Sequence, residues 1–275
     1  MARVLPPGQA IDPGMARLEG LTGASRRVRA AGLDLLAREA TPSERLLGVD
    51  RRREYRLLRR LPAGIPAPKP LAGTAQWLLV DWLEGECLTP AAWRTAVAGG
   101  QLAALLAQLH RGPRHGYPIA LRARYAAYWQ ASDPARRSPA WLRLQQRFMR
   151  ANMPAPLRCA PLHMDIHPGN VLCGHDGGLQ LIDWEYAGDG DIALELAALF
   201  RGNGLDRRQQ ADFLRAYQAS APGYATAVIR RRIDAWAPWV DYLMLMWYEV
   251  RWRQTRQRHF LRRAAPLRGG FGLSF

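Results

Sequence analysis

The residues best suited to chemistry lie close together in the second half of the chain. Asp165 is followed five positions later by Asn170, and Asp183 comes thirteen positions after Asn170. Asn170 opens the apolar run "NVL", and Asp183 closes the run "LQLID". The turn-forming sequence "GHDGG" lies between these runs and predicts a hairpin. A hairpin would bring Asn170 and Asp183 to one point, with Asp165 on the loop that precedes it.

These residue types suit the transfer of a phosphoryl group. Mg²⁺ prefers hard oxygen ligands and keeps several waters, so Asp183 and the amide oxygen of Asn170 would be enough beside nucleotide phosphates. Asp165 would then orient a substrate hydroxyl and accept its proton. Protein kinases use the same three parts. The alternative is that Asp165 and Asn170 only cap turns. The agreement of the spacing, the flanking strands and the second aspartate favours the catalytic interpretation.

Two histidines flank the catalytic aspartate. His163 and His167 have the spacing of a zinc pair on a helix. The following Pro168 and Gly169 disfavour a helix there. We therefore expect both histidines to support the loop through hydrogen bonds to the backbone, not to bind zinc.

Composition sets the class of protein. The chain has 275 residues, 48% of them hydrophobic, which is enough for a full core and excludes disordered and fibrous classes. Its three cysteines show no CxxC spacing, which argues against a disulfide framework and fits a reducing cytoplasm. The N-terminus has no signal-peptide pattern and no apolar stretch is long enough to span a bilayer. We expect a cytoplasmic protein with no membrane association.

The net charge of +16 invites a second hypothesis. Of the 39 basic residues, Lys69 is the one lysine and the other 38 are arginines. A basic surface attracts phosphate backbones, and residues 111–158 hold ten arginines and one acidic residue. This pattern is compatible with an RNA-binding protein on an inactive scaffold. Arginine on solvated helix faces is the interpretation that we favour, and we expect no nucleic-acid partner.

The periodicity of the chain predicts an α+β fold with two lobes. The first lobe, residues 1–86, is small and rich in β-structure, with a hinge at 80–86. The second lobe, residues 87–275, is larger and mainly helical. The elements expected are a hairpin over 19–39, a helical segment over 43–60, a strand over 76–83, strands at 170–173 and 179–183, and helices at 120–131, 138–151, 191–203, 206–220 and 224–258.

The segment "HMDIHPGN…IDWEYAGDGD…ELA" resembles the superfamily of aminoglycoside phosphotransferases and choline kinases, which shares the protein-kinase fold. Within that superfamily the chain is similar to the bacterial thiamine kinases. Three further segments, at 128–143, 184–198 and 248–255, carry this similarity. The resemblance covers nearly the whole chain and is weakest before residue 60.

The resemblance implies where ATP would bind. "GLTGAS" looks like the glycine loop that covers the nucleotide, and "VDWLEGE" (80–86) is similar to the hinge that receives the adenine. The ATP-binding residues implied are Gly20, Gly23, Ser25, Arg38, Asp81 and Trp82. Kinases normally bind phosphate through a lysine on the third strand, but Lys69 lies in a proline-rich connector. Arg38, with Glu54 as its helix partner, is the best positional substitute. Arg38 as an ordinary strand-edge cation, and Glu54 in a surface ion pair, remain alternatives.

Acidic residues gather just after the hairpin. Five of the 23 acidic residues fall within positions 183–195, and Trp184 lies among them. Some of these acids are expected to cap the following helix. The others would give the entrance of the substrate site a negative charge, which would attract a cationic alcohol. An aromatic ring at the same place would also bind such a cation. The substrate-binding candidates are Trp184, Glu185, Asp189 and Asp191.

The resemblance and the residues together predict an ATP- and Mg²⁺-dependent kinase, monomeric, that phosphorylates the hydroxyl of thiamine in salvage of the vitamin. Thiamine combines a permanent positive charge with a primary hydroxyl. A kinase of choline, an amino sugar or an aminoglycoside is the closest alternative. The sequence separates these substrates poorly.

Overall fold

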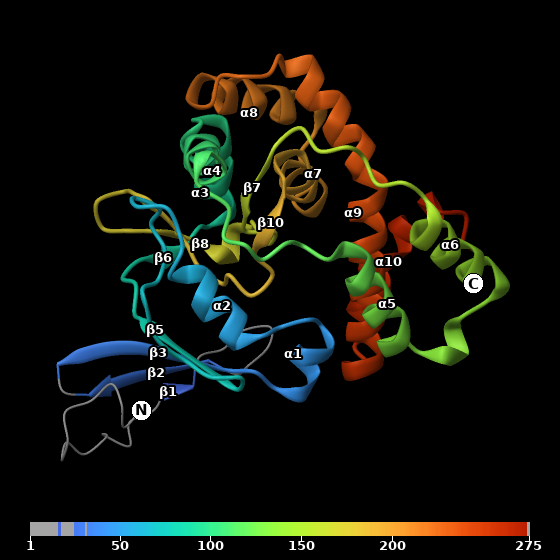
Figure 1. Ribbon diagram of the computed structural model, residues 1–275, viewed down its shortest axis with the longest axis horizontal. Helices are drawn as coiled ribbons and strands as arrows, with labels where there is room; N and C mark the ends of the chain where they lie inside the picture. Colours follow the sequence, from blue (N-terminus) through green and yellow to red (C-terminus); the bar gives the residue numbers. More distant parts are fainter. Residues whose placement is uncertain (1–15, 18–24, 31, 274–275) are drawn as a thin grey trace.

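The computed structural model describes residues 16–17, 25–30 and 32–273. A five-stranded antiparallel sheet forms one end of the molecule, and helices form most of the remainder (Figure 1). The sheet order is β1-β2-β3-β5-β4. Its strands are β1 (Ala16–Arg17), β2 (Ser25–Ala30), β3 (Leu33–Glu39), β4 (Pro70–Gly73) and β5 (Trp77–Asp81). The expected hairpin is present as β2 and β3, and β5 matches the strand predicted at 76–83.

Two short helices follow the hairpin where one helical segment was expected. They are α1 (Pro42–Leu46) and α2 (Arg51–Leu58). Gly48 separates them with a φ of 90°, a left-handed conformation that favours glycine and ends the first helix. Asp50 then begins α2 by accepting hydrogen bonds from the N–H groups of Arg52 and Arg53 at 3.0 Å. Helix α2 packs against β4 and β5, so its buried face lies over the sheet (Figure 1).

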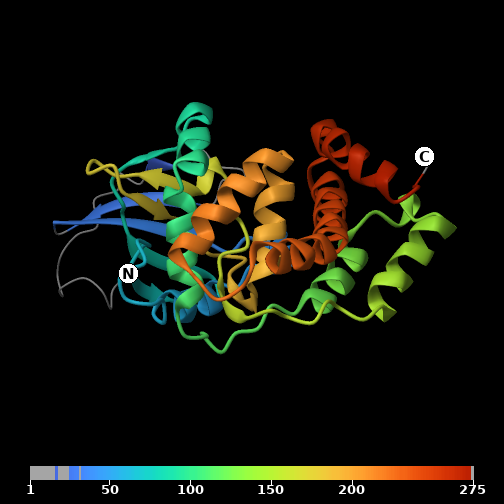
Figure 2. The same ribbon diagram turned by 90° about the horizontal axis from the view of Figure 1, so that it is seen from above.

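The helical part is built around α7, in which eight of the eleven residues are buried. Helices α7 and α9 pack against each other, and α10 packs on α9 (Figures 1 and 2). The helices predicted at 120–131, 138–151, 191–203 and 206–220 are all present. Their bounds are α3 (Pro90–Ala98), α4 (Gln101–Arg111), α5 (Leu121–Ala131), α6 (Pro139–Arg150), α7 (Ile192–Gly202), α8 (Arg207–Ser220), α9 (Thr226–Thr255) and α10 (Arg258–Gly270).

The last helix of the prediction was too long. Helix α9 ends at Thr255, where Arg256 takes a left-handed φ of 56°, and α10 begins two residues later. In the view of Figure 2 the sheet lies at the left, while α9 and α10 lie toward the right. No helix among the described residues is long and apolar enough to cross a membrane.

Short strands between the sheet and the helices carry the expected chemical segment. Strands β8 (Val171–Cys173) and β9 (Leu179–Leu181) form the predicted hairpin, and β6 (Glu86–Cys87) pairs with β8. The segment after the predicted hinge is thereby tied to the hairpin. A second antiparallel pair, β7 (Cys159–Leu162) with β10 (Gly188–Asp191), was not predicted. That residues 1–86 cover the nucleotide, and that residues 87–275 hold the catalytic and metal site, stays a prediction.

Gly85 provides a test of this hinge segment. Its φ is 142°, and a Cβ added there would lie 2.6 Å from the carbonyl oxygen of Cys173. We expect Gly85→Ala to lower the free energy of unfolding by about 1–3 kcal/mol, through backbone strain and the clash. Gly177→Ala is the matched control, because Gly177 also has positive φ but nothing lies within 4 Å of its added Cβ. Chemical denaturation measures both, and an equal loss in the two variants would contradict the role of the clash.

Candidate active site

A buried carboxylate holds the backbone of the loop that carries Asp165. Glu195 on α7 accepts hydrogen bonds from the backbone N–H groups of His163 and Met164, both at 2.6 Å. Its other oxygen lies 2.6 Å from Nε2 of His110, whose Nδ1 lies 2.7 Å from the hydroxyl of Tyr217. Met164 has a φ of 68°, a conformation that a non-glycine residue holds only where its surroundings enforce it. The loop is therefore anchored by α4, α7 and α8 at once. Glu195 was in the acid cluster seen in the sequence, but its anchoring role was not predicted.

The two histidines make backbone hydrogen bonds, as expected of residues that support the loop. Nε2 of His163 lies 2.8 Å from the carbonyl oxygen of Ile182, and Nδ1 of His167 accepts from the N–H of Gly169 at 3.1 Å. His163 thereby links the loop to the residue before Asp183. His167 also lies beside the catalytic candidate, with Nε2 3.8 Å from the Asp165 carboxylate.

Asp165 and Asn170 are in direct contact. The amide nitrogen of Asn170 donates to the backbone oxygen of Asp165 at 2.9 Å and to its carboxylate at 3.0 Å. The amide oxygen of Asn170 is then left as an acceptor for another partner. This arrangement fixes the Asp165 carboxylate without neutralising it.

The protonation of Asp165 is set by its surroundings. Burial, followed by the charge of Asp183, raises the pKa of this carboxyl to about 7. The hydrogen bond from Asn170 and the charge of Arg38 act in the opposite direction. The side chain is 34% exposed, so a ligand can still reach it. Its pKa lies in the range in which a carboxylate serves as a general base near neutral pH.

Asp183 lies at the end of the hairpin in a strained conformation. Its φ is 65°, in the left-handed region that aspartate adopts infrequently. Its carboxylate pairs with the guanidinium of Arg38. Burial alone would raise the pKa of Asp183, but Arg38 outweighs it and holds the pKa below the ordinary value. Asp183 is therefore ionised and 31% exposed, as a cation ligand would need to be.

Arg38 is buried on β3 and faces three carboxylates. Nη1 lies 2.6 Å from Glu54 on α2, and Nη2 contacts Asp183 and lies 3.0 Å from Glu185. The exposed fraction of Glu54 is 3% and that of Arg38 is 6%, so the alternative of a surface ion pair is wrong. Arg38 joins the sheet, α2 and the hairpin, and it is the cation nearest the predicted metal ligand Asp183.

A second buried arginine, which the sequence did not single out, completes this group. Nη1 of Arg51 lies 2.7 Å from Glu54 and 3.0 Å from Glu185. Its Nη2 lies 3.4 Å from Glu44 and 3.1 Å from the carbonyl oxygen of Glu39. Arg51 is one of three consecutive arginines, and the sequence gives no signal that separates it from its exposed neighbour. We call Arg38, Arg51, Glu44, Glu54 and Glu185 the arginine–glutamate cluster.

The negatively charged entrance that the sequence suggested for the substrate is not formed by Glu185, Asp189 and Asp191. Asp189 accepts hydrogen bonds from three successive backbone N–H groups, those of residues 115–117, at 2.7–3.1 Å. Asp191 begins α7 by accepting from the N–H of Ala193, and it also accepts from Nε1 of Trp236 at 2.7 Å. Glu185 belongs to the arginine–glutamate cluster, and burial followed by the charge of Asp183 raises its pKa to about 8. Hydrogen-bond donors of the chain itself thus occupy the carboxylates of Glu185, Asp189 and Asp191.

Trp184 packs beneath the site. It is 1% exposed, its indole N–H donates to the carbonyl oxygen of Leu181 at 2.9 Å, and its ring lies 4.6 Å from that of His163. A substrate contact would need an exposed face of this ring. We assign Trp184 to support of the loop and the hairpin, not to substrate binding.

The structure describes some of the residues predicted to bind ATP, and it shows that some of their backbone groups already have partners. Gly20 and Gly23 lie outside the described residues, and Ser25 begins β2 opposite Arg38. The N–H of Asp81 donates to Lys69 at 3.0 Å and that of Trp82 to Asp34 at 2.9 Å, so neither N–H is free for adenine. The Arg27 guanidinium lies 4.0 Å from the centre of the Trp82 ring. Adenine recognition would need other backbone groups of the 80–86 segment.

Comparisons with known proteins identify the family of the chain. Residues 19–228 match the family described as "Phosphotransferase enzyme family". Thiamine kinases of Shigella dysenteriae serotype 1 and Escherichia coli O157:H7 are each 46% identical to the chain, over 213 and 212 residues. Each match covers 77% of this chain and 73% of the relative. The chain belongs to the phosphotransferase enzyme family. The resemblance seen in the sequence is confirmed.

The fold of this phosphotransferase is that of small-molecule kinases. A choline kinase from Streptococcus pneumoniae superimposes with a TM-score of 0.74 at 18% identity, over 95% of this chain and 94% of the other. An ethanolamine kinase from Plasmodium vivax superimposes with a TM-score of 0.70 at 13% identity, over 97% and 82%. The predicted α+β, kinase-like, two-lobe fold is confirmed.

The donors of this phosphotransferase fit magnesium. Within the described part of the chain, no group of three or more His, Cys, Asp or Glu side chains could hold a metal ion alone. Asp183 and the amide oxygen of Asn170 are hard donors of the kind that Mg²⁺ uses when it shares its coordination with phosphates and water. The residues therefore fit an ion that arrives with a nucleotide.

The raised pKa of Asp165 predicts how stability depends on pH. The folded carboxyl has a pKa of about 7 against 3.8 for the ordinary side chain, so the folded state binds more protons between these values. The free energy of unfolding attributable to Asp165 therefore falls as pH rises through this range. Asp165→Asn removes the titration, so its melting temperature relative to the native protein should rise from pH 5 to pH 8.

Thermal unfolding followed by circular dichroism at both pH values measures this difference. Asp234→Asn is the control, because Asp234 is an exposed carboxylate on α9, and its difference should stay flat. A flat difference for Asp165→Asn as well would contradict the desolvation of Asp165.

Proposed function

We propose that this phosphotransferase transfers the γ-phosphoryl group of ATP to the hydroxyl of thiamine and yields thiamine phosphate. The observation that carries the proposal is the juxtaposition of Asp165, Asn170 and Asp183 within a kinase-like fold. The 46% identity to thiamine kinases over most of the chain supports thiamine as the substrate. Such an enzyme would act in salvage of the vitamin.

Asp165 is the proposed general base. The substrate oxygen attacks the γ-phosphorus, the bond between that phosphorus and the β–γ bridging oxygen breaks, and ADP leaves. The hydroxyl proton passes to the Asp165 carboxylate. Asn170 holds this carboxylate in place, and Glu195 holds the backbone that carries it. Positioning of the two reactants supplies a large part of the acceleration.

Asp183 and Asn170 are the proposed Mg²⁺ ligands. When bound, Mg²⁺ would neutralise charge on the phosphates during transfer. Arg38 is the proposed phosphate-binding cation in the place of the usual lysine. Its guanidinium presents several donors in one plane, suits phosphate oxygens and keeps its charge when buried. In this proposal Arg38 keeps Glu54 and exchanges its contact with Asp183 for a phosphate.

Charge at the substrate side also fits a cationic alcohol. The side chains of Asp165 and Asp183 are 34% and 31% exposed, whereas those of Glu185 and Asp189 are 5% and 8% exposed. The negative charge open to a ligand therefore lies at the reacting centre, not along residues 185–191. With Asp183 occupied by Mg²⁺ in this proposal, a cation bound beside the transferred group would meet the Asp165 carboxylate first.

Transfer of labelled γ-phosphate from ATP tests the substrate. We expect labelled thiamine phosphate as the product, with choline and an amino sugar transferring at most about 1% as fast, because a site built for one alcohol discriminates by several kcal/mol. The reaction should stop when Mg²⁺ is chelated. Faster transfer to choline or to the amino sugar would overturn thiamine as the substrate and leave the kinase assignment standing.

Substitution of the base and of a metal ligand tests the mechanism. Asp165→Ala should lower kcat about 10²–10⁴-fold with little change in KM for ATP, because the loss is that of a general base. Asp183→Asn should instead raise the Mg²⁺ concentration needed for half-maximal rate. Steady-state kinetics at varied Mg²⁺ separate the two effects. Near-native turnover of Asp165→Ala, or an unchanged Mg²⁺ requirement in Asp183→Asn, would refute the corresponding role.

A further inference from the structure

Arg51 occupies an unusual place in the arginine–glutamate cluster. It is 1% exposed, and it contacts the backbone or side chains of β3, α1, α2 and the segment after the hairpin. It does not contact Asp165, Asn170 or Asp183 by any ion pair or hydrogen bond within the described residues. Apart from the field of its charge at Asp183, Arg51 can influence phosphoryl transfer only through the residues that it contacts.

The residue it acts on is Arg38, because the two arginines share the same carboxylates. Arg38 binds Oε1 of Glu54 at 2.6 Å while Arg51 binds Oε2 of the same carboxylate at 2.7 Å. Both arginines lie 3.0 Å from Oε2 of Glu185. Each glutamate is thus divided between two cations.

The charges explain why this division matters. Arg38 and Arg51 carry two positive charges, and Glu44, Glu54, Glu185 and Asp183 are four carboxyl groups around them. A buried carboxylate that loses one partner turns to the remaining cation, because an unpaired buried charge is costly. Without Arg51, Glu54 and Glu185 would both have Arg38 as their remaining partner. Arg38 would then be held in the cluster and away from a phosphate.

We propose that Arg51 is a positioning residue that keeps Arg38 available to the phosphates of ATP by occupying the second oxygen of Glu54 and sharing Glu185. The inference rests on the proposed function, in which Arg38 binds phosphate. It adds a residue with no contact to the reacting groups to the determinants of nucleotide affinity. It also assigns a role to Glu185, which sequence reasoning had placed at the substrate.

Kinetics of an Arg51 variant test the proposal. Arg51→Gln should raise KM for ATP about tenfold or more, with KM for the alcohol changed less than about twofold, because one partner of a buried charge pair is removed on the nucleotide side only. Arg51→Lys keeps the charge but cannot contact two carboxylates and a carbonyl together, so its KM for ATP should be intermediate. It also serves as the test if Arg51→Gln fails to fold.

A second substitution separates positioning from a merely structural role. Glu185→Gln removes one carboxylate that competes for Arg38, so Arg51→Gln combined with Glu185→Gln should recover KM for ATP at least about threefold relative to Arg51→Gln alone. A structural role predicts the opposite, with the double variant weaker than either single variant.

Arg52 supplies the matched control. It is the next residue on α2, and its side chain is exposed. Arg52→Gln should leave both KM values unchanged. Arg38→Gln tests whether Arg38 binds the phosphates of ATP, on which the inference rests. It should raise KM for ATP at least as much as Arg51→Gln does.

The outcomes distinguish two claims, that Arg38 binds phosphate and that Arg51 positions Arg38. If Arg38→Gln leaves KM for ATP unchanged, the phosphate-binding role of Arg38 fails and the inference falls with it. If Arg38→Gln raises KM for ATP but Arg51→Gln and Arg51→Lys do not, only the positioning role of Arg51 is overturned. A rise in Arg51→Gln that Glu185→Gln does not relieve also overturns it.

Discussion

The structure depends on a buried group of charges that joins its two parts. Arg38 comes from the sheet, Glu54 from the helix that packs on the sheet, and Asp183 and Glu185 from the segment after the β8–β9 hairpin. Removing these charges from water costs several kcal/mol per ion, which only close pairing offsets. The cluster therefore fixes how the sheet lies against the helical part. A hydrophobic contact of the same size would hold the parts together but would not fix the orientation of a guanidinium toward Asp183.

The sequence carried enough information to predict the structure of the segment that holds the proposed catalytic residues, because its signals are local. Asp165, Asn170 and Asp183 lie within nineteen positions of one another, and turn residues between two apolar runs specify the hairpin that joins them. Helices such as α7 and α8 were also predictable, because each has a capping aspartate and an apolar periodicity of its own. Strands β7 and β10 were not, since "CAPL" and "GDGD" have little strand propensity of their own. In the folded protein β7 lies against α4 and α7, and β10 lies against α7.

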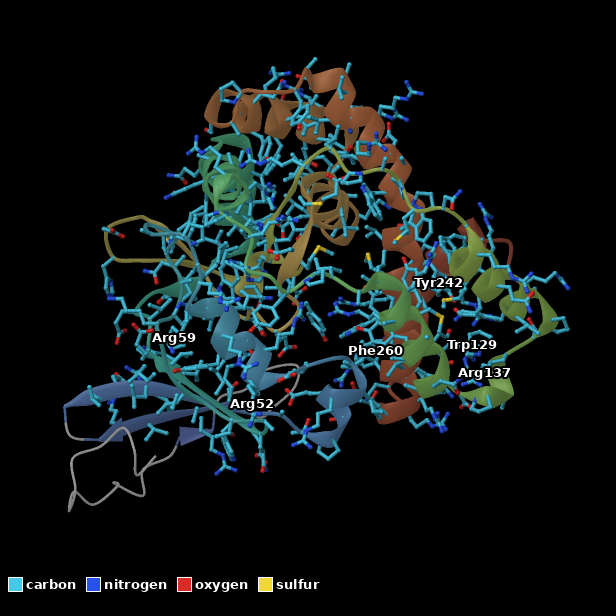
Figure 3. All side chains as sticks on the ribbon, in the orientation of Figure 1. Arg52, Arg59, Trp129, Arg137, Tyr242 and Phe260 are labelled. Carbon is cyan, nitrogen blue, oxygen red and sulfur yellow. The ribbon has the colours of Figure 1, made fainter. Side chains whose placement is uncertain are left out.

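The partners of charged residues could not be predicted in the same way. Asp189 and Asp191 look like a negative surface in the sequence, but folding places backbone N–H groups of residues 115–117 and the indole of Trp236 against them. The arginine surplus has a similar explanation in part. Arg137 lies over the ring of Trp129, 4.9 Å from its centre, and Figure 3 shows the two side chains close together. Arg136 pairs with the buried Glu249. These arginines support packing of the helical part.

The electrostatics of Asp165 connect the cluster to catalysis. The negative charge of Asp183 helps to raise the pKa of Asp165, and the charge of Arg38 lowers it. Any cation that neutralises Asp183 removes the first of these effects, so it lowers the pKa of Asp165 and leaves the carboxylate better able to hold charge until a hydroxyl proton reaches it. Positive charge placed beside Asp183 therefore favours the ionised form of Asp165. The geometry thus links ionisation of Asp165 to the charge carried next to Asp183.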